Sequence, residues 1–97
     1  MEKEKLIRTL NSVGKECFIT YFDHFINLSI PNYEIVKKLF SETKYTKNSC
    51  VTRTSKARSI VKKGMVKDAL YVVSSAKVPV HIAQKAGELL FERARRP

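Results

Sequence analysis

Apolar side chains recur at helical spacing along almost the whole of this chain, and strand signals are weak. Its 97 residues contain only three glycines and three prolines, with no Asn-Gly or Asp-Gly pair to mark a tight hairpin. The sequence therefore predicts an all-α fold, a compact bundle of four to six short helices. A chain of this length supports one small hydrophobic core, so we expect a single domain over 1–97.

Residues 1–28 form an aromatic-rich helical part of the predicted fold. Its apolar stripe begins at Leu6 and Leu10 and continues beyond Gly14, where the low helix propensity of glycine predicts a break or a kink. The aromatic members of the stripe are Phe18, Tyr21, Phe22 and Phe25. Their helical spacing favours burial, either inside the monomer or in a homodimer that forms through them. A platform for stacking single-stranded bases is the alternative.

A connector separates this part from the next predicted helix. Pro31 restricts the residue before it, and Ser29 or Asn32 can cap the helix that follows. We therefore expect a helix over 32–41.

The helix after that is expected over 47–63. Thr46 or Asn48 can cap its beginning, and Gly64 lies where a left-handed residue would end it. Residues 65–95 should form the C-terminal helices, although 71–73 would also suit a strand. The closing arginines, Arg93, Arg95 and Arg96, favour a solubilising tail, with a second phosphate contact as the alternative.

The tract from Lys44 to Lys67 holds eight basic residues and no Asp or Glu, while Ser and Thr occupy many of the remaining positions. The whole chain carries a formal net charge of +10. Local clustering of this kind is more informative than a uniformly basic composition, because it concentrates positive potential on one surface. A surface rich in lysine and hydroxyl groups suits phosphate, which makes nucleic acid the leading candidate partner.

The helix expected over 47–63 divides into two faces at 100° per residue. A narrow inward stripe of small side chains is predicted from Cys50, Thr54, Ala57 and Val61. The outer face would carry Thr52, Ser55, Lys56, Ser59, Lys62 and Lys63, with Arg53 and Arg58 at its two flanks. Lysines and hydroxyls on such a face reach phosphate oxygens or base edges, and flanking arginines can fork onto phosphate or guanine.

Segment 32–63 resembles helix-turn-helix DNA-binding domains, in which one helix crosses the DNA backbone and the next lies in the major groove. The supporting helix would be 32–41, the turn 42–46 and the recognition helix 47–63. The turn contains no glycine and is longer than the usual three or four residues. The resemblance implies that these residues face the bases or the nearest phosphates: Lys47, Ser49, Thr52, Arg53 and Lys56.

We therefore predict a small basic DNA-binding protein, a transcriptional regulator or a regulatory protein of a phage or mobile element, that reads duplex DNA with helix 47–63. The predicted contact set is Lys44, Lys47, Ser49, Thr52, Arg53, Ser55, Lys56, Arg58, Ser59, Lys62 and Lys63. Two alternatives stay open. One is a structured-RNA-binding protein. The other is a small inhibitor or adaptor whose basic face meets an acidic protein.

Other functions find little support in the sequence. The four candidate metal ligands, Cys17, His24, Cys50 and His81, are scattered without a paired unit, so no metal site is expected. No Gly-rich phosphate loop or obvious carboxylate pair indicates catalysis or a cofactor. Since no apolar run approaches the length of a membrane span and none resembles a signal peptide, we expect a cytoplasmic protein with reduced thiols.

Overall fold

Helices account for all of the regular structure in the computed structural model, which describes residues 2–95 and contains no strand in that range. The described helices are α1 (Lys3–Val13), α2 (Lys15–Thr20), α3 (Phe22–Ile26), α4 (Asn32–Glu42), α5 (Lys47–Lys62), α6 (Val66–Ser74) and α7 (Val80–Arg95). The predicted all-α class is confirmed, but these seven helices exceed the four to six expected. Arg96 of the predicted tail lies outside the described residues.

The higher count arises from two breaks in the N-terminal part. Gly14 separates α1 from α2 with a φ of 92°, a region that residues with a side chain rarely adopt. Tyr21, with φ −108° and ψ 23°, separates α2 from α3. The first break was predicted from glycine. The second was not, because the apolar stripe continues through Tyr21 without a breaking residue.

The aromatic stripe forms the centre of the hydrophobic core. The Phe18 ring meets Phe22 edge-on at 5.8 Å between centroids and stacks on Phe25 at 6.1 Å. Both of those rings, together with Phe18 and Tyr21, are buried within the single chain. Their predicted burial is confirmed. Because these four side chains are buried inside one chain, they offer little surface to a second molecule, and a homodimer through them stays a prediction.

Local signals place α4 and α5 close to their predicted limits. Pro31 is the residue immediately before α4. Thr46 caps α5 by accepting a hydrogen bond from the Ser49 amide at 3.1 Å, so Thr46 rather than Asn48 is the cap. At the other end Gly64 has a φ of 71°, and the next amide, that of Met65, donates to the Ile60 carbonyl.

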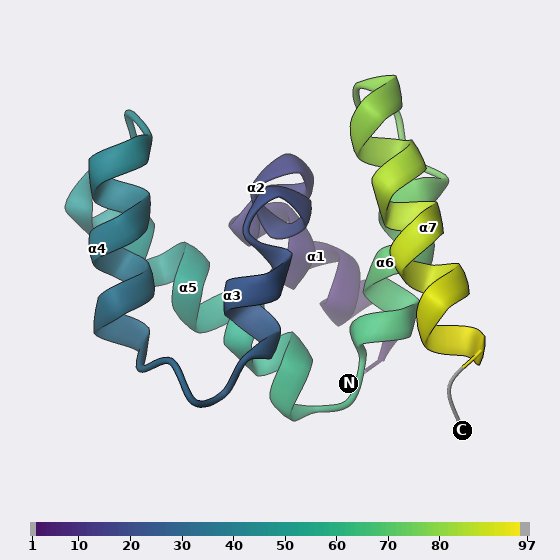
Figure 1. Ribbon diagram of the computed structural model, residues 1–97, viewed down its shortest axis with the longest axis horizontal. Helices are drawn as coiled ribbons and strands as arrows, with labels where there is room; N and C mark the ends of the chain where they lie inside the picture. The colour runs from purple at the N-terminus through teal and green to yellow at the C-terminus, as the bar shows by residue number, and fades with distance from the viewer. Residues whose placement is uncertain (1, 96–97) are drawn as a thin grey trace.

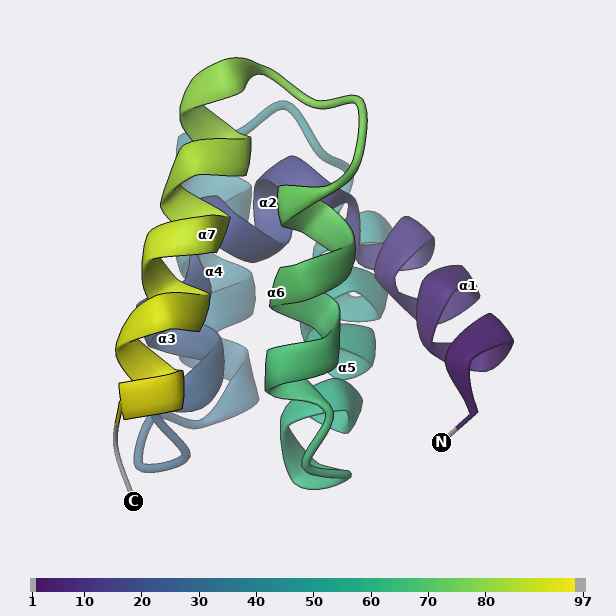
Figure 2. The same cartoon turned by 90° about the vertical axis from the view of Figure 1, so that its right-hand side faces the viewer.

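Helix α5 contacts helices from both the N-terminal and the C-terminal parts of the chain. Figure 1 shows α4 at one end, the α6–α7 pair at the other, and the three N-terminal helices between them. Helix α5 packs against α1, α3 and α4. Figure 2 shows α6 and α7 side by side along most of their length.

Segment 71–73 lies inside α6, so of the helix and the strand that the sequence left open, the structure shows the helix. Within residues 2–95, no helix combines the length and hydrophobicity that a membrane crossing requires.

Candidate nucleic-acid interface

Helix α5 has one buried side, and this side fixes which residues can face a partner. Cys50, Thr54 and Ala57 are fully buried, as predicted for the inward stripe. The stripe continues through Ile60, which is also fully buried, whereas Val61 is only half-buried. The inward face is therefore wider than the predicted stripe, with Ile60 on one flank and Arg58 on the other.

The opposite side of α5 and the loop before it keep most of the predicted contact residues in solvent. The exposed members are Lys44, Lys47, Thr52, Ser55, Lys56, Lys62 and Lys63. Ser49 and Ser59 are half-buried. None of these lysines forms an ion pair within the described part of the chain, where the ion pair observed joins Lys38 to Glu42 at 2.7 Å. Their positive charge is therefore not compensated by ion pairs with carboxylates of residues 2–95.

Arg58 does not belong to this exposed face. Its side chain is 4% exposed, and Nη2 donates hydrogen bonds to the main-chain carbonyls of His24, Asn27 and Ile30. Burial lowers the pKa of the guanidinium from its ordinary value, although arginine remains charged at neutral pH. The prediction that Arg58 forks onto phosphate is therefore wrong. The residue instead ties α5 to the connector between α3 and α4.

Arg53 also makes contacts within the protein. Its Nη1 donates to the Val13 carbonyl at the end of α1, and its Nε donates to Ser49 Oγ at 2.8 Å. The guanidinium carbon lies 3.8 Å from the centre of the Tyr45 ring, a cation–π contact. A cation at the carboxyl end of a helix also complements the helix dipole. Arg53 is half-buried, and in this position it stabilises the junction of α1 and α5.

Helix α1 adds basic residues that the sequence reasoning missed. A hollow of about 240 Å³ lies between α1 and α5 and is lined by Lys5, Arg8, Thr9, Ser12 and Lys56. Three of the five are cationic, two are hydroxyl residues and none is a carboxylate. The helical spacing of Lys5, Arg8 and Ser12 places them on one face of α1. That spacing was readable in the sequence, but the position of this face beside α5 was not.

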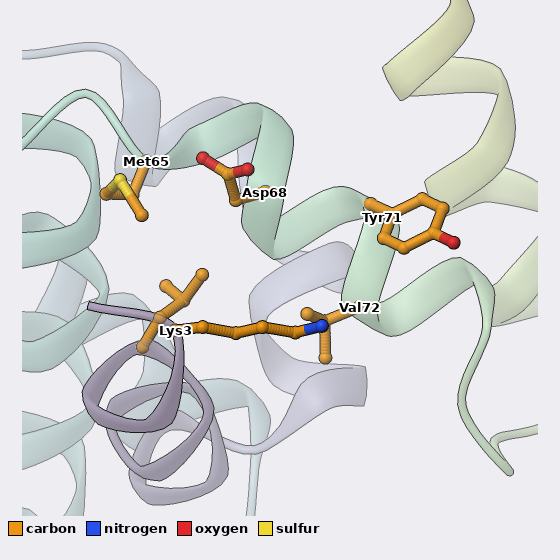
Figure 3. Close-up of a pocket in the computed structure, with 6 residues that line it drawn as sticks. Lys3, Met65, Asp68, Tyr71 and Val72 are labelled. Atoms are coloured by element: carbon orange, nitrogen blue, oxygen red, sulfur yellow. The ribbon is translucent and has the colours of Figure 1, made fainter. Parts of the chain in front are cut away.

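A second hollow, between α1 and α6, has a different character. Figure 3 shows Lys3 extending across it towards Val72, with Asp68 on the facing helix. Its volume is about 270 Å³, and Leu6, Met65 and Tyr71 complete the lining. Because it mixes one acid, one base and several apolar groups, it is less suited to phosphate than the hollow beside Lys56.

The four candidate metal ligands of the sequence lie on four different helices, α2, α3, α5 and α7. No group of three or more His, Cys, Asp or Glu side chains is arranged to hold a metal ion within residues 2–95. Cys17 and Cys50 are both buried free thiols, and burial is the main cause that raises the pKa of Cys17 above its ordinary value. A raised pKa keeps this thiol protonated and unreactive at neutral pH.

Comparisons of the chain with protein-family models, with curated proteins and with solved structures found no match. The helix-turn-helix resemblance of segment 32–63 therefore stays a prediction.

Proposed function

We propose that this protein binds duplex DNA through the exposed face of α5 together with the neighbouring cations of α1. The observation that carries the proposal is the hollow in which Lys5, Arg8 and Lys56 converge from two helices without a carboxylate in the lining. Lys62 and Lys63 are exposed at the end of α5 and add to its positive charge. Such an uncompensated surface attracts a polyanion and gains free energy when counterions are released from the DNA.

The contacts on this face are suited to phosphate more than to base edges. The two arginines of α5, which would supply forked contacts to guanine, are engaged with main-chain carbonyls inside the protein. What remains outside is lysine, together with the small hydroxyl residues Thr52 and Ser55. Lysine acts as a compact point charge, and phosphate contacts position a protein without specifying sequence. We therefore expect tight but weakly sequence-selective binding, in which α5 lies along the duplex.

A charge-reversal experiment tests this assignment. In fluorescence anisotropy with a random-sequence duplex near 0.1 M salt, the double variant Lys56→Glu and Lys62→Glu should bind roughly 50-fold more weakly, since each lost phosphate contact costs about 0.9 log unit there. The matched control is Lys77→Glu with Lys85→Glu, which reverses two exposed lysines outside the proposed face. Equal losses of affinity in both double variants would show that binding depends on the net charge of the protein and not on the proposed face.

The same titration separates DNA from RNA. A structured RNA hairpin of equal charge should compete weakly with the duplex, because its deep, narrow major groove presents the backbone in a different geometry. Tighter binding of the hairpin, lost in the Lys56→Glu and Lys62→Glu variant, would reassign the same face to RNA.

A further inference from the structure

The flank of α5 that faces α4 carries an open apolar groove. It has a volume of about 550 Å³ and is lined by Asn32, Tyr33, Val36, Lys37, Phe40, Lys47 and Val51. Tyr33 is 71% exposed, Phe40 56% and Val51 48%. A group of large apolar side chains that a folded chain leaves in water marks an interaction surface more often than isolated exposed residues do.

The residues of α4 that line the groove have the spacing typical of a helix face that packs against a second helix. Tyr33, Val36, Lys37 and Phe40 stand at the first, fourth, fifth and eighth positions of a run in α4. They form one stripe that spans two turns, or about 10 Å at 1.5 Å per residue. Val51 closes the other side of the groove from α5. An amphipathic helix with apolar residues at the same spacing could lie along this stripe.

The charges around the groove indicate what the polar side of such a helix would carry. Lys37 and Lys47 lie in the lining, and no carboxylate does. Of the two acids in α4, Glu34 is exposed in the first turn but does not line the groove. Glu42 accepts hydrogen bonds from Lys38 at 2.7 Å and from Tyr21 at 3.1 Å. These partners, Lys38 first, hold the pKa of the Glu42 carboxyl below its ordinary value. The groove therefore complements a negatively charged ligand.

We infer that this groove, defined by Tyr33, Phe40 and Val51 with Lys37 and Lys47, docks an acidic amphipathic helix of a partner protein. A second copy of the chain is the weaker candidate, because a net charge of +10 would bring like charges together. Nucleic acid is also a weaker candidate than the acidic helix, because the surface of the groove is mainly apolar. The groove lies on the α4 side of α5, whereas the proposed DNA face continues onto α1. Lys47 belongs to both surfaces, but the residues changed in the DNA test, Lys56 and Lys62, do not line the groove.

A designed peptide tests the inference on the full chain. The probe is a fluorescein-labelled helical peptide of fifteen residues with leucines at positions i, i+3, i+4 and i+7 and glutamate or glutamine elsewhere. Its control is a scrambled peptide of the same composition, which has the same charge but no apolar stripe. The ordered peptide should bind at least tenfold more tightly than the scrambled one in anisotropy at 0.15 M salt. Equal binding would overturn the inference, because it would show charge attraction alone.

Variants then locate the site. Phe40→Ser should weaken binding of the ordered peptide at least tenfold, and Lys37→Glu should weaken it several-fold. Phe91→Ser in α7 is the matched control, since Phe91 is 65% exposed and lies outside the groove. Circular dichroism checks that each variant is folded, and Tyr33→Ser replaces Phe40→Ser if that variant does not fold.

Two further measurements test the other candidate ligands of the groove, a second copy of the chain and nucleic acid. Sedimentation of the unmodified protein should show a monomer at the concentrations of the peptide assay. Concentration-dependent dimers that Phe40→Ser abolishes would assign the groove to a second copy and overturn the inference. A ten-residue oligothymidylate should not displace the ordered peptide. Displacement that depends on Phe40 would assign the groove to stacked bases instead.

Discussion

Replacing Arg58 by alanine should be among the most destabilising single substitutions in this chain. Its Nη2 atom donates to three carbonyls, at 2.7 Å for Ile30 and 3.1 Å for both His24 and Asn27. This nitrogen carries two hydrogens, so three acceptors share two donors and the arrangement amounts to about two full hydrogen bonds. A hydrogen bond from a charged group contributes about 1.5–3 kcal/mol, which places the expected loss at roughly 3–6 kcal/mol.

That loss is large against the stability of a small domain. A chain of 97 residues is expected to have a total free energy of unfolding of about 5–15 kcal/mol. Arg58→Ala should therefore leave the folded state only marginally stable at 37 °C. Urea unfolding followed by circular dichroism at 222 nm and 25 °C measures the difference directly. Arg58→Lys keeps the charge and three donors and should lose less. Lys62→Ala, at an exposed position of the same helix, should stay within about 0.5 kcal/mol of the unmodified protein.

Two results would refute the reasoning about Arg58. A loss below about 1 kcal/mol in Arg58→Ala would mean that the three carbonyls are satisfied without the guanidinium. A large loss of duplex affinity in a folded Arg58→Ala variant, measured at 10 °C, would return Arg58 to the set of phosphate contacts. We expect its affinity to stay within twofold of the unmodified protein.

Further predictions concern the backbone and one buried hydroxyl. Gly14→Ala should cost about 1–3 kcal/mol of unfolding free energy, because φ is 92° and a Cβ would lie 2.6 Å from Arg53 Nη1. Gly87→Ala, inside α7 with nothing near the added methyl group, should instead raise the unfolding free energy by about 0.5–1 kcal/mol. If Gly87→Ala were the less stable of the two variants, the reasoning about both glycines would be contradicted. Burial and donation to the Glu42 carboxylate raise the pKa of Tyr21 to about 12, above the ordinary value of about 10 for an unfolded chain. Stability from Tyr21 is therefore complete below pH 10 and is lost as pH rises towards 12, so the difference in unfolding free energy between the unmodified protein and Tyr21→Phe should shrink between pH 10 and 12. A gap that stays constant would count against this linkage.

The sequence predicted best those features that depend on a few neighbouring residues. The beginnings of α4 and α5 and the end of α5 follow from Pro31, Thr46 and Gly64, whose backbone and capping preferences act locally. The burial of the aromatic stripe followed from its spacing. The break at Tyr21 was not predicted, because Tyr21 continues the apolar stripe and is not a residue that disfavours helix.

The site was predicted only in part, for a related reason. A helical wheel places Arg58 at a flank, and nothing local indicates that the connector around Asn27 brings three carbonyls to that flank. Likewise, the wheel of α1 shows a basic face at Lys5 and Arg8, but only the tertiary packing of α1 beside α5 places it next to Lys56. Such contacts join residues distant in the chain, so periodicity and capping cannot reveal them.

The most direct test of the proposed DNA-binding face is the salt dependence of affinity for a random-sequence duplex. With Lys5, Arg8, Lys56, Lys62 and Lys63 each neutralising one phosphate, the logarithm of the association constant should fall against the logarithm of salt concentration with a slope of about −4 to −5. The Lys56→Glu and Lys62→Glu variant should show a slope smaller in magnitude by about 2, and the Lys77→Glu and Lys85→Glu control should keep the original value. A slope near zero, or an unchanged slope in the first variant, would contradict the account.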